Sequence, residues 1–179
     1  MTLRAFQLPV SYRAGSAGFA IDVRPLAVGL TVLSVLALFL LSGQMLNLAG
    51  IPYDAAGGSP LFKIHPASYL SVLALAAWIV ADGGPGAFLA RCWRESPGLV
   101  VLFLAIGLLA FQVIGVQKTP ISQVTDNFVL TACLFASLVR LQPREIRFVA
   151  LLVQGILAIN SLLGYAEVLG GFRLTPLYV

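Results

Sequence analysis

The sequence predicts an all-α polytopic membrane protein with five transmembrane helices, a cytoplasmic N-terminus and a periplasmic C-terminus. Three observations support this prediction: the composition, the long apolar runs, and the position of the positive charges between those runs. Of the 179 residues, 59% are apolar and only 10% are charged, and the mean hydropathy is +0.96. This composition is too apolar for a soluble domain of that size.

The same composition excludes several other classes of protein. Disordered chains have low hydropathy, and two cysteines are too few for a small secreted domain held by disulfides. The eleven basic residues are scattered through apolar sequence and do not form one basic face for nucleic acid. Membrane lipid is therefore an expected partner, and nucleic acid is not.

The first predicted span, residues 26–46, is a nearly unbroken apolar run. Pro25 lies in its first turn, and Asp22 and Arg24 lie just before it. The run is long enough to cross a hydrocarbon core of about 30 Å. A long flank precedes it and no convincing small-residue cleavage site follows, so we expect an uncleaved anchor rather than a signal peptide.

Four further apolar segments complete the predicted region, which covers residues 25–169. Residues 99–116 and 148–169 are long enough to span without difficulty, whereas residues 66–81 are at the short limit. The segment 121–139 has a short apolar core and must include the stretch around Asp126 to cross fully.

The basic residues determine the predicted orientation, because Lys and Arg accumulate in short cytoplasmic loops. Five spans with a cytoplasmic segment 1–24 and a periplasmic segment 170–179 place eight basic residues inside and three outside. If residues 66–81 did not cross, the division would be five to six, so five spans are favoured. The eight are Arg4, Arg13, Arg24, Arg91, Arg94, Arg140, Arg144 and Arg147, and the three are Lys63, Lys118 and Arg173.

Small residues indicate where the helices should pack, because apolar burial alone gains little between helices in lipid. Polar side chains occur on two faces of the segment 148–169, so we expect this last helix to be buried within the bundle. The small residues that we expect at contacts are Ala77, Ala81, Ala132, Ala136 and Gly155.

The sequence contains no pattern of a catalytic or metal site. Cys92 lies in a predicted cytoplasmic loop and Cys133 within a span, so they are at different membrane levels and a disulfide is not expected. His65 has no second ligand of suitable spacing for a metal, so a helix-start role is favoured over proton handling or substrate contact. Phosphate-loop, GxSxG and HExxH motifs do not occur. We predict no catalytic residue, no metal and no cofactor.

Three residues are candidates for substrate binding: Arg173, Glu167 and Asn160. An Arg guanidinium at the outer surface suits phosphate or pyrophosphate, although an interfacial anchor is the favoured role. A carboxylate at membrane depth costs about 2.5 to 3.5 kcal/mol unless it has a partner or water. Glu167 and Asp126 are therefore placed at the membrane surface rather than in a relay or ligand site, and Asn160 is favoured as a partner between helices over a substrate contact.

A basic turn, LVRLQPREIRFV, leads into a long apolar segment, LLVQGILAINSLLGYAEVLGGFRL. This pattern is similar to the N-terminal half of the bacterial O-antigen ligase and polysaccharide polymerase-like membrane proteins. The resemblance implies an inner-membrane protein that transfers an undecaprenyl-diphosphate-linked glycan to a sugar hydroxyl, without a metal or nucleotide. A base would take the acceptor proton while cationic groups stabilise the diphosphate leaving group. Arg173 is the position that could match an arginine of the family.

The sequence departs from this family pattern at Val179, where members of the family continue towards a large catalytic periplasmic loop. We therefore expect the chain to be incomplete and inactive alone. The alternative is a non-catalytic scaffold subunit of a biosynthetic or transport complex, with another membrane subunit as its partner. Half of a secondary transporter is less favoured, because the paired broken helices of such repeats do not occur in this sequence.

Overall fold

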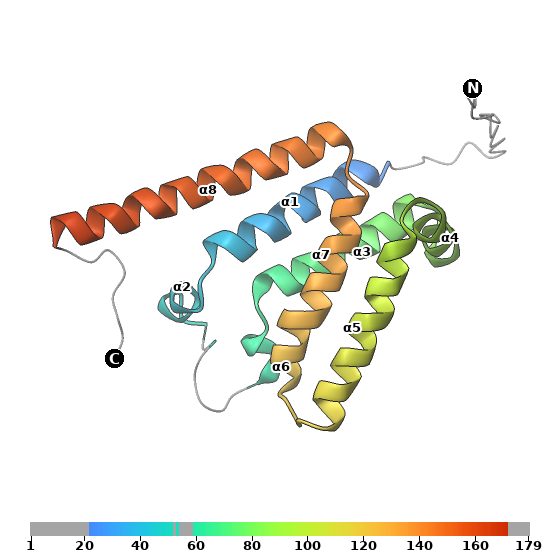
Figure 1. Cartoon of the computed structure of the whole chain (residues 1–179), viewed down its shortest axis with the longest axis horizontal. Helices are drawn as coiled ribbons and strands as arrows, with labels where there is room; N and C mark the ends of the chain where they lie inside the picture. Colours follow the sequence, from blue (N-terminus) through green and yellow to red (C-terminus); the bar gives the residue numbers. More distant parts are fainter. Residues whose placement is uncertain (1–21, 52, 54–58, 172–179) are drawn as a thin grey trace, which may run out of the picture.

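The computed structural model describes residues 22–51, 53 and 59–171, and within these ranges the chain is helical and contains no strand (Figure 1). The predicted all-α class is therefore confirmed for the described chain. The elements are α1 (Arg24–Leu40), α2 (Gly43–Leu48), η1 (Pro60–Lys63), α3 (Pro66–Ala81), α4 (Pro85–Glu95), α5 (Pro97–Gly115), α6 (Ile121–Val124), the π-helical turn η2 (Thr125–Val129), α7 (Leu130–Val139) and α8 (Pro143–Gly170).

Five membrane spans were predicted, but fewer helices are long and apolar enough to cross a membrane. Among the described residues, three do so: α5, the continuous Ile121–Val139 segment and α8. The pair formed by α3 and α4 makes a fourth if it is one span, bent by 93°. Helix α1 is apolar but has only 17 residues. The structure thus supports three to four candidate spans of an α-helical membrane protein.

The first predicted span ends early. Helix α1 ends at Leu40, and Leu41 is extended rather than helical, so residues 26–46 are not one helix. The physical reason is the pair Ser42 and Gly43, since glycine weakens a helix interior and serine favours the first position of a new helix. The Ser42 side chain accepts a hydrogen bond from the Met45 N–H at the start of α2.

Helices α1 and α3 pack most closely together, and small buried side chains make this contact possible. The Ser34 hydroxyl donates to the Ala67 carbonyl at 3.0 Å, and the Trp78 indole N–H donates to the Thr31 hydroxyl at 3.2 Å. Helix α7 packs on α3 through the buried Ala136. Of the small residues expected at contacts, Ala77 and Ala136 are buried and Ala132 is half-buried, whereas Ala81 and Gly155 are exposed.

Helix α8 is not buried in the bundle, so that prediction is wrong. It packs against α1, extends beyond the end of α1 (Figure 1), and buries only Val149 and Ile156. The contacts lie in its first half because α8 has 28 residues and α1 has 17. The polar residues that suggested burial, among them Gln154 and Tyr165, are exposed.

The predicted cytoplasmic loop that contains Arg91 and Arg94 is the helix α4. Two glycines, Gly83 and Gly84, adopt positive φ values of 89° and 117° and turn the chain sharply after α3. Pro85 is the first residue of α4, a position whose N–H has no partner within the helix, so proline is well tolerated there. Cys92 is consequently not in a loop but on the buried face of this helix.

The antiparallel pair α1 and α3 gives the bundle two ends. We call the end that holds Arg24, Asp82 and Arg140 the arginine end, and the opposite end, which holds Leu41, His65 and Asp126, the Asp126 end.

Candidate functional site

Asp126 lies on the π-helical turn η2, between α6 and α7. A π turn contains one residue more than the corresponding α-helical turn, and such turns are frequent at functional sites. Here the turn places Asp126 against the start of α3 rather than towards lipid.

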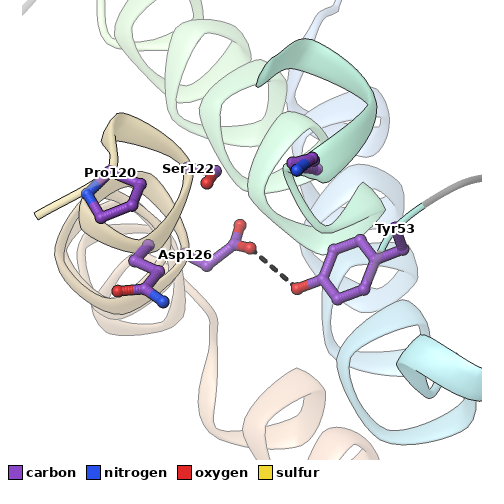
Figure 2. Close-up of a pocket in the computed structure, with 6 residues that line it drawn as sticks. Tyr53, Pro120, Ser122 and Asp126 are labelled. Carbon is purple, nitrogen blue, oxygen red and sulfur yellow. Dashed lines mark hydrogen bonds between the residues drawn. The ribbon is translucent and has the colours of Figure 1, made fainter. Parts of the chain in front are cut away.

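Three groups donate hydrogen bonds to the Asp126 carboxylate. The Ser68 hydroxyl donates at 2.6 Å, the His65 backbone N–H at 2.9 and 3.1 Å to the two oxygens, and the Tyr53 hydroxyl at 3.0 Å (Figure 2). Two of these groups belong to the first turn of α3, where the helix dipole favours a negative charge. The carboxylate therefore connects the fourth apolar segment to the start of α3.

His65 is the N-cap residue of α3. Its Nδ1 accepts a hydrogen bond from the Ala67 N–H at 3.2 Å, so the ring proton lies on Nε2. Nε2 donates to the Leu41 carbonyl at 2.7 Å, just after α1 ends. The ring of Tyr53 meets the imidazole edge-to-face at 5.9 Å. The neutral imidazole thus joins the ends of α1 and α3, at the helix start where the sequence placed it.

A pocket of about 290 Å³ lies beside this hydrogen-bonded group, and we call it the Asp126 pocket. Figure 2 shows Pro120, Ser122 and Asp126 together on the α6–η2 side, with the Asp126 carboxylate directed towards Tyr53 opposite. Lys63 is half-buried and contributes an ammonium group to the same lining. The lining residues are Tyr53, Lys63, Pro120, Ser122, Gln123 and Asp126. The pocket therefore combines a carboxylate, a cation, hydroxyls and an amide.

Of the residues that the sequence suggested for substrate binding, Asn160 and Glu167 do not line the Asp126 pocket. Arg173 lies outside the described residues. Asn160 is exposed and Glu167 is half-buried, both on the second half of α8. No hydrogen bond joins the Asn160 side chain to another helix among the described residues, so the structure does not give it the predicted role between helices.

Sequence reasoning missed Tyr53, Lys63 and Ser68, because they lie on other segments and carry no motif. The available signal was Asp126 itself, the one carboxylate in the segment 121–139. Such a carboxylate needs partners, since an unpartnered charge at membrane depth is costly.

The arginine end contains a second polar group, built from ion pairs. Asp82, whose side chain is 4% exposed, pairs with Arg140 at 2.8 Å and with Arg91 at 2.9 Å. Arg140, 9% exposed, also pairs with Glu95 at 2.9 Å. These contacts hold α4 against the ends of α3 and α7, so their first consequence is structural.

A cavity of about 500 Å³ adjoins these ion pairs. Its lining contains the arginines Arg24, Arg91 and Arg140 and the acids Asp22, Asp82 and Glu95. Because three positive and three negative side chains balance, this cavity favours neither an anion nor a cation. The Asp126 pocket is accordingly the stronger candidate site.

Within the described ranges, no group of three His, Cys, Asp or Glu side chains is arranged to hold a metal ion. No protein-family model, curated protein or solved structure matches this chain. The apolar helices define the class, an α-helical membrane protein, and any more specific function depends on the chain's own geometry.

Proposed function

We propose that this protein belongs to bacterial surface polysaccharide or exopolysaccharide biosynthesis and binds the sugar diphosphate headgroup of an undecaprenyl-linked glycan in the Asp126 pocket. The observation that carries this proposal is that Lys63 and Asp126 line one pocket at the end of an apolar bundle. The sequence pattern around residues 138–174, which resembles O-antigen ligases and polysaccharide polymerases, supports the same substrate class.

The two halves of such a substrate suit the two environments that this end of the bundle offers. A polyprenyl chain stays in the bilayer, while its headgroup lies at the surface. The Lys63 ammonium attracts the phosphate oxygens, and the Gln123 amide and Ser122 hydroxyl can exchange hydrogen bonds with sugar hydroxyls. Asp126 already accepts from three protein donors, so we assign it to holding the pocket and the sugar rather than to removing a proton.

The proposal includes five crossings of the bacterial inner membrane, made by α1, α3, α5, the α6–α7 segment and α8. The arginine end then lies on the cytoplasmic side. The basic residues of α4 and of the start of α8 lie at that end, in agreement with the positive-inside rule. Helix α1, with 17 residues, is about 26 Å long, and a short span of this kind is accommodated by local thinning of the bilayer.

The proposal is tested by measuring the affinity of the purified protein, reconstituted in lipid nanodiscs, for a short-chain polyprenyl diphosphate that carries one sugar. Lys63→Gln should weaken affinity about tenfold or more, because a hydrogen bond to a charged group is worth about 1.5 to 3 kcal/mol. Lys118→Gln is the matched control, since Lys118 does not line the pocket. The sugar-free diphosphate should also lose affinity with Lys63→Gln, whereas Asp126→Asn should weaken binding of the glycosylated lipid more than binding of the sugar-free one.

Equal affinities for Lys63→Gln and Lys118→Gln, or no binding by the unaltered chain, would overturn the assignment of the pocket. Binding of the sugar-free lipid as tight as that of the glycosylated one would restrict the site to a lipid diphosphate.

A second candidate function, a scaffold subunit in a membrane complex, is favoured by α8. Its second half exposes apolar side chains, among them Leu162, Leu163 and Val168, with the polar Asn160 and Ser161 nearby. A photo-crosslinking residue at Leu163 should then capture one membrane protein from the native membrane, whereas the same residue at Val101 on α5 should capture lipid. Equal products at both positions would contradict this role.

A further inference from the structure

Helix α4 runs at 93° to α3, along the arginine end of the bundle. Gly83 and Gly84 make the bend before it, and only Ser96 separates it from α5. Since α3 and α5 both reach this end, α4 lies across the bundle there rather than along it (Figure 1).

The side chains of α4 divide it lengthwise into an apolar and a charged half. Phe88 and Cys92 are buried in the bundle core. Leu89 and Trp93 follow these two residues in the sequence, lie one helical turn apart, and are 57% and 65% exposed. The apolar half therefore continues from the protein core out to an exposed surface.

The charged half faces the other way. Arg91 pairs with Asp82, and Glu95 pairs with Arg140, beside the polar cavity of the arginine end. A cavity lined by six charged side chains belongs on the aqueous side of a membrane. Leu89 and Trp93, on the opposite half of the helix, then face the hydrocarbon.

The arginine end also contains arginines that are not paired with a carboxylate. The carboxylates of Asp82, Glu95 and Glu145 are all paired with arginines. Three exposed arginines have no carboxylate partner among the described residues; they are Arg94, Arg144 and Arg147. Only Arg94 lies on α4 itself.

We propose that α4 is an interfacial helix that binds anionic phospholipid, with Leu89 and Trp93 inserted among the acyl chains and Arg94 bound to the lipid phosphate. An amphipathic helix with an aromatic residue on one face and Arg on the other is suited to this position, and tryptophan settles at the headgroup level. A partner protein fits less well, because the exposed apolar part of α4 is narrow and flanked by cations. This proposal does not depend on the glycan site at the other end of the bundle.

Tryptophan fluorescence provides the test, because the chain has two tryptophans in contrasting environments. Trp78→Phe leaves Trp93, and Trp93→Phe leaves Trp78, which is 2% exposed. Each variant is reconstituted into phosphatidylcholine vesicles whose lipids carry bromine either near the glycerol or near the chain terminus. Trp93 should be quenched strongly by the shallow bromine and weakly by the deep one, and Trp78 should respond less than Trp93 to the shallow bromine.

If Trp78→Phe does not fold, the difference between the unaltered chain and Trp93→Phe isolates the signal of Trp93. Stronger quenching of Trp93 by the deep bromine would show a re-entrant helix, and no quenching would show that protein or water covers it. Either result overturns the proposal.

A second arm tests the headgroup. Brominated phosphatidylglycerol at a low fraction in phosphatidylcholine should quench Trp93 more than brominated phosphatidylcholine at the same fraction. One basic residue near an anionic surface corresponds to about a fivefold enrichment, so Arg94→Gln should remove most of this excess. Lys118→Gln, at the other end of α5, should leave it unchanged. If Arg94→Gln retains the additional quenching by brominated phosphatidylglycerol, as Lys118→Gln does, phosphate binding by Arg94 is contradicted.

Discussion

The Asp126 carboxylate accepts hydrogen bonds from Tyr53, His65 and Ser68, partners that the sequence did not predict for it. These donors belong to segments 58 to 73 residues away in the chain. A single side chain therefore joins the fourth apolar segment to the start of α3, and it does so whether or not a ligand occupies the pocket.

Replacing Asp126 with Asn should lower the free energy of unfolding by about 1 to 3 kcal/mol, because one acceptor oxygen and the negative charge beside the α3 dipole are lost. Thermal unfolding in detergent, followed by circular dichroism, measures the change. Asp22→Asn is the control, since its carboxylate is exposed. The same small change for both variants would show that the Asp126 contacts add little to stability.

Substitutions can separate the contributions of the two hydrogen bonds that the His65 side chain makes. His65→Asn retains a side-chain acceptor at the N-cap but cannot make the bond to the Leu41 carbonyl, whereas His65→Ala loses both. We expect His65→Ala to be less stable than His65→Asn by about 1 kcal/mol, the value of an N-cap. Unfolding of both variants in parallel decides the point, and equal stabilities would assign the contribution to the Leu41 bond alone.

At the scale of elements, α4 and η2 are the two that differ most from simple spans. The ion pairs of Arg140 hold α4 to α3 and α7, and the extra residue of the π turn directs Asp126 towards α3. Each is a local departure from regular helix that brings polar groups together across the bundle.

The docking of α4 can be followed through Cys92. Burial raises the pKa of the Cys92 thiol above its ordinary value, and only the thiolate reacts readily with maleimide. In a Cys133→Ala background, we expect slow labelling at neutral pH and a rate that continues to rise at pH values above the ordinary thiol pKa.

Arg140→Gln should increase the labelling rate of Cys92 at pH values where the thiol is ionised, because a buried ion pair is broken and α4 loosens. Loss of the Arg140 charge by itself acts the other way, since that charge lowers the pKa of the Cys92 thiol. Arg144→Gln, an exposed arginine of the same end, is the control. Unchanged labelling in Arg140→Gln would mean that apolar contacts of Phe88 and Cys92 hold α4 without the ion pairs.

At the scale of the whole molecule, the described chain is a bundle with two polar ends and one helix that extends beyond it. Its exposed surface is rich in Leu, Phe and Val, which a bilayer accommodates and water does not. The arrangement separates the Asp126 pocket, proposed to bind a glycan headgroup, from α4, proposed to bind lipid, by the length of α1 and α3.

Cysteine accessibility tests the five proposed crossings directly. In a Cys92→Ala, Cys133→Ala background, Asp22→Cys should react with a membrane-impermeant maleimide only after the inner membrane is opened. Lys118→Cys and Leu169→Cys should react from the periplasm. Reaction of Asp22→Cys and Leu169→Cys on the same side would exclude an odd number of spans.

Several elements could be predicted closely from the sequence alone. The bounds of α3 are those predicted, residues 66–81, and the fourth segment also covers 121–139. Length and hydropathy suffice for such segments, because the transfer of an apolar run into lipid depends on its own residues. The end of α1 at Leu40 was missed, since the turn tendency of Ser42 and Gly43 was given less weight than the apolar residues on both sides.

The sequence by itself determined that this is a helical membrane protein and, closely, where most of its apolar segments begin and end, because hydrophobicity and turn residues act locally. Only the tertiary structure decided that Tyr53, Lys63 and Asp126 share one pocket, that α4 is a docked helix and that α8 lies outside the bundle. Those results depend on the rotation and pairing of helices far apart in the chain, which no single segment encodes.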